Sequence, residues 1–130
     1  MIVLDASAVV DWLLQTPAGQ QIESRVYSGN ESLHAPHLLD LEVTQVLRRL
    51  TREGVITVHR ADEAIADLLD LRINRYAHFV LLPRIWRMRH NVSAYDAAYI
   101  ALAETLGATL LTRDARLASA SGHSAAVELF

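Results

Sequence analysis

Four acidic residues occupy positions from which their carboxylates could act together. Asp5 closes the apolar run MIVLD that opens the chain, and Asp114 follows the run ATLLT by two residues. Asp96 lies in the first turn of the clearest predicted helix, three residues after Ser93, while Glu42 lies beside the apolar stripe of another helix. A lone buried carboxylate is costly unless it is paired, hydrogen-bonded or bound to a metal. The placement therefore indicates one acidic pocket.

Converging carboxylates repel one another, and this repulsion raises their pKa values. A hard divalent cation relieves the repulsion, and a set of oxygen ligands in a chain without cysteine favours Mg²⁺ or Mn²⁺ over Zn²⁺. Such a cation can activate water and stabilise charge on a phosphate, so phosphodiester hydrolysis is the natural chemistry. The predicted catalytic and metal-binding residues are Asp5, Glu42, Asp96 and Asp114, with the hydroxyls of Ser7 and Thr112 as supporting groups.

Each of these acids also has a purely structural interpretation. Asp5 could bond to the turn that follows it, and Asp96 and Asp114 could each stabilise the start of a helix. Glu42 could extend to solvent or pair with a nearby arginine of its own helix. We favour the acidic pocket, because one shared site explains all of these placements together.

Short apolar strands alternate with amphipathic helices along the whole chain. Strands are predicted over residues 1–5, 32–35, 72–76, 108–112 and 126–129. Helices are predicted over 8–15, 18–27, 36–53, 61–71, 81–89, 93–106 and 115–120, with Ser7 capping the first and Pro36 in the first turn of the third. This order predicts an α/β fold with a parallel sheet covered on both faces, whose site lies beyond the carboxyl ends of the strands.

Composition sets the class of protein and excludes several chemistries. A chain of 130 residues, 52% hydrophobic and 21% charged, predicts one packed domain over 1–130. Neither a membrane span nor a signal segment is recognisable, so we expect a cytoplasmic protein without membrane contact. All 12 basic residues are arginine, which excludes a P-loop and any catalytic lysine, and the absence of cysteine excludes disulfides and thiol nucleophiles.

Arginines and aromatic residues are interleaved between residues 72 and 91, where no acid occurs. Arginine contacts phosphates and aromatic side chains stack on unpaired bases, a combination typical of RNA-binding surfaces. A solvated basic face with the aromatic residues in the core remains the alternative. The arginines predicted to bind substrate are Arg84, Arg87, Arg113 and Arg116.

The ordered set of motifs resembles PIN-domain ribonucleases, most closely the VapC-type toxins of bacterial type II toxin–antitoxin systems. The motifs are MIVLDAS at the start, LDLE at 39–42, SAYDAAYIALAE at 93–104 and LLTRDARL at 110–117. The resemblance implies a three-layer α/β/α sandwich and Mg²⁺-dependent endonucleolytic cleavage of RNA. It also implies a homodimer, and a VapB-like antitoxin whose C-terminal segment lies across the active-site groove.

The resemblance further implies a role for each acid. Asp5 and Asp96 would ligate the metal directly, Asp114 would complete the pocket, and Glu42 would ligate through water or orient the nucleophile. Two other functions remain open: a housekeeping PIN nuclease in RNA maturation, and a catalytically silent metal-binding interaction module. A receiver-like signalling domain is excluded by the absence of lysine, and a haloacid-dehalogenase-type phosphatase by Ser7 where a second acid is needed.

Overall fold

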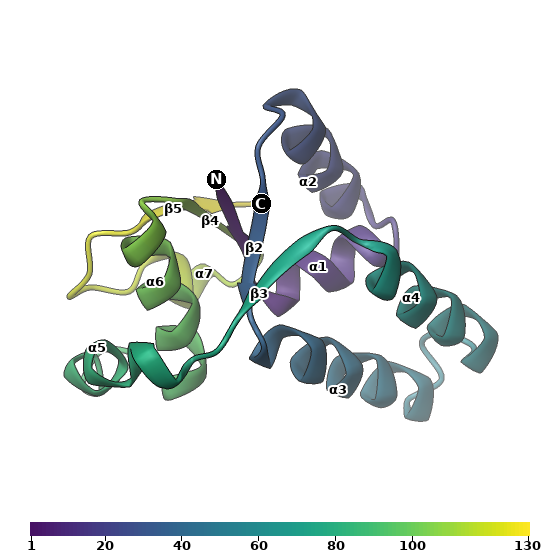
Figure 1. Ribbon diagram of the computed structural model, residues 1–130. Helices are drawn as coiled ribbons and strands as arrows, with labels where there is room; N and C mark the ends of the chain where they lie inside the picture. The colour runs from purple at the N-terminus through teal and green to yellow at the C-terminus, as the bar shows by residue number, and fades with distance from the viewer.

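A five-stranded parallel sheet forms the centre of the computed structural model, which describes residues 1–130 (Figure 1). The strands are β1 (Ile2–Leu4), β2 (Leu33–Pro36), β3 (Ile73–Tyr76), β4 (Thr109–Thr112) and β5 (Ala126–Leu129). Their order is β3-β2-β1-β4-β5, and every neighbouring pair is parallel. The chain builds outward from β1 to β2 and β3 and then returns to the other side of β1. The strand order therefore reverses between β1 and β4, the place where α/β sheets hold their ligands.

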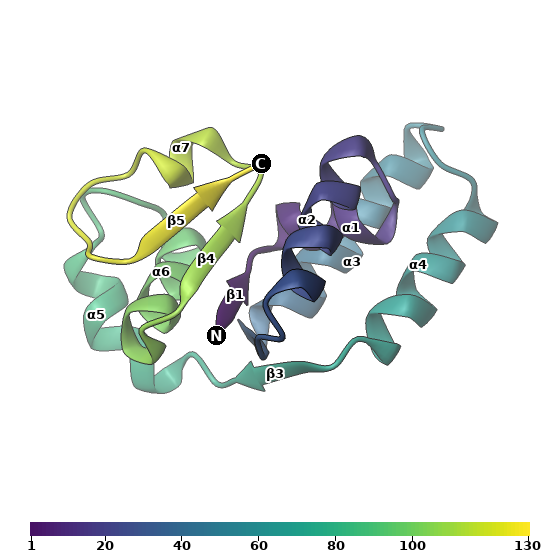
Figure 2. The same cartoon turned by 90° about the horizontal axis from the view of Figure 1, so that it is seen from above.

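Helices cover both faces of this sheet and make the fold a three-layer α/β/α sandwich (Figures 1 and 2). One face carries α1 (Ala6–Leu13), α2 (Pro17–Ser28), α3 (Leu38–Arg52) and α4 (Val58–Asp70). The other carries α5 (Leu82–Arg87), which follows the short 3₁₀ helix η1 (Phe79–Leu81), and α6 (Ala94–Leu106). The last helix, α7 (Ala115–Ala118), links β4 to β5. The predicted fold class is confirmed.

The core lies between β1 and the helices on either side. Every residue of β1 is fully buried, as expected for a central strand covered on both faces. Helix α6 buries an unbroken run, residues 97–103, whose alanines let it approach the sheet closely. Helices α1 and α2 meet at Gly19, where a Cβ atom would lie 1.9 Å from the carbonyl oxygen of Asp11. None of the helices has the length and apolar character needed to cross a membrane.

Two details of the predicted elements are wrong. Helix α1 begins at Ala6 and is capped by Asp5, not Ser7, because the Asp5 carboxylate accepts the backbone N–H of Ala8. Pro36 ends β2 instead of opening α3, which starts at Leu38. Strand β1 pairs with β2 only at Leu33 and His34, so the missing N–H of Pro36 costs no bond to β1.

Candidate active site

The Asp5 carboxylate is buried at the carboxyl end of β1, where it is held from two sides. Its Oδ1 accepts hydrogen bonds from the Ser7 hydroxyl at 2.7 Å and from the Ala8 N–H at 2.9 Å. Its Oδ2 accepts a hydrogen bond from the Thr112 hydroxyl at the end of β4. Burial raises the pKa of Asp5, although these hydrogen bonds oppose the shift. The Asp5 carboxylate thereby connects the carboxyl ends of β1 and β4, the two strands between which the strand order reverses.

Thr112 and Ser7 also fix the segment that follows β4. The Thr112 hydroxyl accepts the backbone N–H of Asp114 at 2.9 Å, and the Ser7 hydroxyl accepts that of Arg113 at 2.9 Å. Asp114 in turn caps α7 by accepting the N–H of Arg116 at 2.9 Å. The two predicted supporting hydroxyls therefore connect Asp5 to the loop that carries Asp114.

Glu42 reaches the same region from α3 and is held there by a tyrosine of α6. The Tyr99 hydroxyl, on a side chain only 2% exposed, donates to Glu42 Oε1 at 2.6 Å. Burial raises the pKa of Glu42, the Tyr99 bond opposes the shift, and the charges of Asp96 and Asp5 raise it further. Burial and the bond to Glu42 raise the pKa of Tyr99 as well, so Tyr99 is a fixed donor.

Tyr99 is not among the site residues predicted from the sequence, and its contact with Glu42 was missed. A signal was available, because Tyr99 lies three residues after Asp96 and therefore on the same side of one helix. A buried tyrosine hydroxyl usually has a hydrogen-bond partner. A tyrosine on the same helix face as a site acid is therefore a candidate hydrogen-bond donor to one of the site's carboxylates.

Asp96 completes the group from the first turn of α6. Its backbone N–H donates to the Ser93 hydroxyl at 3.1 Å, which makes Ser93 the cap of this helix. Burial raises the pKa of Asp96, and the charge of Asp114 raises it further. Each of the raised carboxyl pKa values at this edge thus includes repulsion from another of the predicted acids. The structure therefore brings all of them into one electrostatic environment.

The carboxylates of this edge have almost no cationic partner within the chain, and their oxygen atoms suit a hard divalent cation. Asp5, Glu42 and Asp96 form no ion pair, and the guanidinium nearest Asp114, that of Arg116, lies 3.9 Å away on a side chain that is 92% exposed. Several oxygen ligands that repel one another in a partly buried site are what Mg²⁺ and Mn²⁺ neutralise. As they stand, no three acidic or histidine side chains converge tightly enough to enclose an ion.

The four predicted substrate-binding arginines have different surroundings. Arg84 is engaged within the fold, because its guanidinium donates to both carboxylate oxygens of Glu104, at 2.8 and 2.9 Å, and to the carbonyl of Gly122. Glu104 lies two turns along α6 from Asp96, about 12 Å away. Arg87 is exposed on α5. Arg113 borders the acids but pairs with Asp11, whereas the exposed Arg116 lowers the pKa of Asp96.

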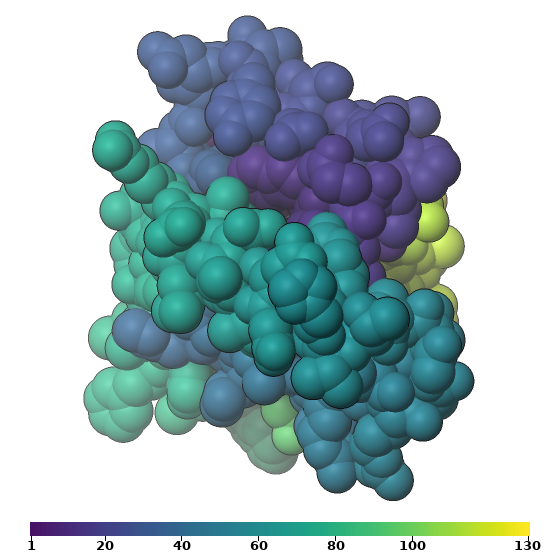
Figure 3. All heavy atoms as spheres, turned by 90° about the vertical axis from the view of Figure 1, so that its right-hand side faces the viewer, coloured from purple at the N-terminus to yellow at the C-terminus, as the bar shows by residue number.

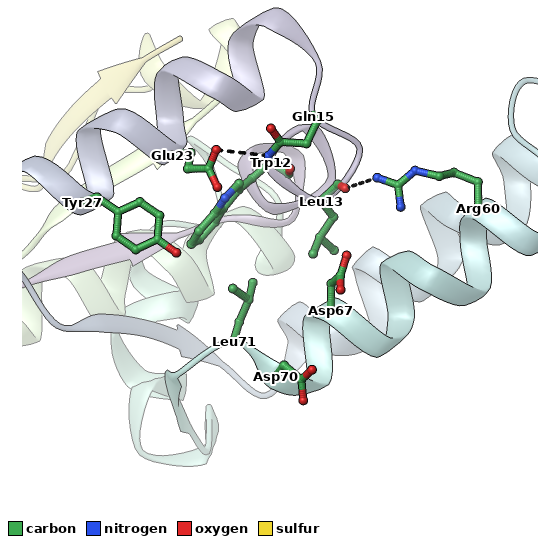
Figure 4. Close-up of a pocket in the computed structure, with 9 residues that line it drawn as sticks. All are labelled: Trp12, Leu13, Gln15, Glu23, Tyr27, Arg60, Asp67, Asp70 and Leu71. Carbon is green, nitrogen blue, oxygen red and sulfur yellow. Dashed lines mark hydrogen bonds between the residues drawn. The ribbon is translucent and has the colours of Figure 1, made fainter.

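A separate hollow of 280 Å³ lies between α1, α2 and α4 (Figure 4). Trp12, Leu13 and Leu71 contribute its apolar lining, and the exposed ring of Tyr27 lies at one side of it, edge-on to Trp12. Its polar lining consists of Gln15, Glu23, Arg60, Asp67 and Asp70. None of the predicted catalytic acids lines this hollow, so it is a second surface feature distinct from the acidic edge.

The fold and the acidic edge together define the class of protein. It is a three-layer α/β domain with carboxylates gathered where β1 and β4 end, at the reversal of strand order. Comparison with known proteins places the chain within this class. The profile of the family described as "PIN domain" matches residues 2–122.

Relatives and solved structures agree with this match. The chain is 39% identical to Ribonuclease VapC12 of Mycobacterium tuberculosis over 129 residues, which cover 99% of this chain and 98% of that protein. It is 44% identical to Ribonuclease VapC1 of the same organism over 131 residues, covering 98% and 96%. VapBC2 from Rickettsia felis, solved bound to a promoter DNA fragment, superposes with a TM-score of 0.67 at 12% identity, covering 99% and 98%. The chain belongs to the PIN-domain family and, within it, to the VapC ribonucleases.

Proposed function

We propose that this chain cleaves RNA endonucleolytically at the acidic edge, with a divalent cation, Mg²⁺ or Mn²⁺, and acts as the toxin of a type II toxin–antitoxin pair. The observation that supports this most strongly is the gathering of Asp5, Glu42 and Asp96 where β1 and β4 end, on side chains that form no ion pair and whose carboxyl pKa values are raised. An electrostatically unfavourable group of this kind is expected where a bound ion performs chemistry. Relatives named ribonucleases over nearly the whole chain give the substrate class.

In this proposal Asp5 and Asp96 hold the cation, and Asp114 completes its surroundings. When bound, the cation stabilises the negative charge that develops on the scissile phosphate. Glu42 orients the attacking water and accepts its proton, a role suited to a carboxyl group whose pKa lies above the ordinary value of 4.5. The hydroxyl of Tyr99 fixes one oxygen of Glu42 and thereby aims the carboxylate.

Cleavage of total RNA by the purified protein tests this function. We expect discrete new ends with Mg²⁺ or Mn²⁺ that disappear with EDTA and in Asp5→Asn, which keeps its fold by circular dichroism. Equal cleavage by Asp5→Asn would reject the site. Cation binding without cleavage of any RNA would favour the silent binding module. A gene neighbour encoding a small antitoxin would separate the toxin from a housekeeping nuclease.

In addition to the active-site groove that the C-terminal segment of a VapB-like antitoxin would cross, we propose the hollow between α1, α2 and α4 as a second antitoxin contact. The lining of this hollow is partly apolar, and three acids, Glu23, Asp67 and Asp70, outnumber its one base, Arg60. This lining suits a partner segment that presents apolar side chains together with arginine or lysine. We expect Tyr27→Ala, which removes an exposed ring that lines the hollow, to weaken antitoxin binding in a pull-down with the co-expressed partner, whereas Val55→Ala, which removes an exposed apolar side chain outside the hollow, leaves it unchanged.

A homodimer is the last part of the proposal, and an exposed apolar face supports it. Helix α5, the preceding η1 and the start of α6 carry Val80, Leu82, Trp86 and Tyr95 at exposed fractions of 46% to 76%. Two neighbouring hollows share Leu82 as a lining residue, which makes the face continuous. Exposed apolar patches of this kind mark interfaces. We expect Val80→Glu/Trp86→Glu to shift the protein from dimer to monomer in sedimentation velocity, and an unchanged dimer would place the interface elsewhere.

A further inference from the structure

The acidic edge continues along α3 into a group of arginines that the catalytic site does not use. Helix α3 starts where β2 ends, so its first turns lie at the carboxyl edge of the sheet, with Glu42 in the second turn. Arg49 follows Glu42 by seven residues, two helical turns, and so lies on the same side about 10 Å further along. Arg52 lies one turn beyond both Arg48 and Arg49, and the three side chains border one hollow. Figure 3 shows the side of the molecule on which α3 ends and α4 begins.

These arginines have no acidic partner, whereas five of the other nine arginines in the chain form ion pairs. Ion pairs hold Arg25, Arg75, Arg84 and Arg113 to carboxylates of the fold. No ion pair involves Arg48, Arg49 or Arg52. Three like charges on adjacent turns repel one another, although the C-terminal end of the helix favours positive charge. Their arrangement is therefore not explained by bonds within the chain.

The arginines also line an open hollow rather than covering the core. Its volume is 360 Å³, and its lining is Gln45, Arg48, Arg49, Arg52 and Glu53, with no hydrophobic residue. Three positive charges against the single negative charge of Glu53 leave the hollow positive. Guanidinium groups in such a setting favour phosphate, because they donate several hydrogen bonds in one plane. An apolar partner segment has nothing to bury there.

We propose that Arg48, Arg49 and Arg52 form a phosphate-binding track along α3 that holds the RNA strand beyond the bond being cut. The inference rests on the proposed ribonuclease function and extends it from the scissile phosphate to the flanking nucleotides. Phosphates outside the acidic edge need their own cations, since the acids there repel the backbone that the enzyme must bind. The track on α3 supplies positive charge next to the side of the site formed by Glu42. It acts in affinity and leaves the chemical step to the acids.

The track predicts a dependence on RNA length and on salt. In an inactive Asp96→Asn background, Arg49→Ala/Arg52→Ala should lower the affinity for a fluorescein-labelled single-stranded RNA of about 16 nucleotides roughly tenfold. The slope of log affinity against log salt should fall by about 1.4, from two phosphate contacts at about 0.7 each. An RNA of about four nucleotides, too short to reach the track, should lose almost no affinity. In the active protein, the same double variant should raise KM for the long RNA and keep kcat.

Two control variants separate a phosphate contact from a structural role. Arg49→Lys/Arg52→Lys keeps the charges and should retain most of the affinity, whereas a loss as large as that of the alanine pair would overturn the track. Arg72→Ala removes an exposed arginine with no ion pair just before β3, at the opposite end of the sheet, and should change nothing. An equal loss in Arg72→Ala would mean that any surface arginine contributes equally, which also overturns the proposal.

The same measurements distinguish this inference from the proposed function and from another ligand. Cleavage by the wild-type protein tests the ribonuclease, and the affinity of the alanine pair tests the track, so either can fail alone. Unchanged RNA affinity in the alanine pair overturns the track. If that pair instead loses affinity for a poly-glutamate peptide and not for RNA, the arginines serve an acidic protein segment and the RNA track is rejected.

Discussion

The acidic residues at the two ends of the sheet differ in their ion pairing and in the direction of their pKa shifts. At the carboxyl end, Asp5, Glu42 and Asp96 are without ion pairs, and burial with mutual repulsion raises their pKa values. At the amino end, Glu31 bonds to the N-terminal amine and to Arg25, and Glu104 bonds to Arg84; these cations lower the pKa of both acids. The paired acids at the amino end therefore stabilise the fold, whereas the unpaired acids at the carboxyl end lower its stability when they are ionised.

The largest expected effect comes from removing a charge at the carboxyl end. Asp5→Asn should lower the rate of RNA cleavage by at least about a hundredfold, since even the outer partners of metal ligands change activity 10- to 100-fold. Glu104→Gln, an acid-to-amide change of the same kind at the amino end, should leave the rate unchanged. Cleavage rates of the two variants under one set of conditions check this. Comparable losses would mean that the two ends do not differ in function.

Stability should respond in the opposite order. Glu104→Gln breaks a bidentate ion pair with Arg84 on a carboxylate that is only 14% exposed. Because the Arg84 side chain is 36% exposed and partly screened, we expect a loss of about 1–2 kcal/mol in the free energy of unfolding. Urea denaturation measures it. A loss of similar size in Asp96→Asn, measured without divalent cations, would remove the contrast between the two ends.

The pH dependence of stability should also have opposite signs at the two ends. Asp96 has a folded-state pKa above its ordinary value of 3.8, so its contribution is fully present below that value and is lost as pH rises through the folded pKa. Glu104 has a folded-state pKa below 4.5, so its contribution is present above 4.5 and is lost as pH falls through the folded pKa. Urea unfolding of Asp96→Asn and Glu104→Gln across the acid range checks both signs.

Without divalent cations, Asp96→Asn should therefore flatten the loss of stability on raising the pH and be slightly more stable than wild type near neutrality. Glu104→Gln should flatten the loss on lowering the pH. If both variants flatten the change in stability on the same side of the pH range, the opposite pKa shifts assigned to these acids are wrong.

The smallest effect is expected from the tyrosine that aims Glu42. Tyr99→Phe removes the donor at 2.6 Å, whose bond lowers the pKa of Glu42 against the effect of burial. The acidic limb of the pH–rate profile should therefore move to higher pH, with a loss of about fivefold in kcat at neutral pH that raising the pH partly restores. Tyr95→Phe, which alters an exposed tyrosine on the same helix, should match wild type. A uniform loss at every pH would indicate a packing defect instead.

Periodicity and short motifs were enough to predict the α/β fold and the residues of the acidic edge. The apolar runs ending at Asp5 and Thr112 had to be parallel strands, and parallel strands place their carboxyl ends at one edge. That rule brings Asp5 and Asp114 together without any knowledge of contacts. Ser93 was predictable as a cap because its hydroxyl and the N–H of Asp96 are local in sequence.

The remaining features depend on contacts between distant parts of the chain. Pro36 satisfies the local rule for a helix start, yet the pairing of β2 with β3 keeps it in the strand. Arg84 was predicted to contact substrate from the composition of its segment. Only the packing of α5 on α6 shows that its guanidinium forms an ion pair with Glu104. The bond from Tyr99 to Glu42 joins residues 57 positions apart, so the sequence could indicate Tyr99 as a candidate donor but could not identify Glu42 as its partner.

Calorimetric titration of Mn²⁺ into the wild-type protein and its variants tests the central claim most directly. We expect wild type and Glu104→Gln to bind the ion, with an affinity that falls as the pH is lowered through the acid range, because carboxyl groups must be ionised to ligate it. Asp5→Asn and Asp96→Asn should lose most of that affinity. Equal binding by all of these proteins, or binding without any effect of pH, would contradict the assignment of the carboxyl end of the sheet as the metal centre.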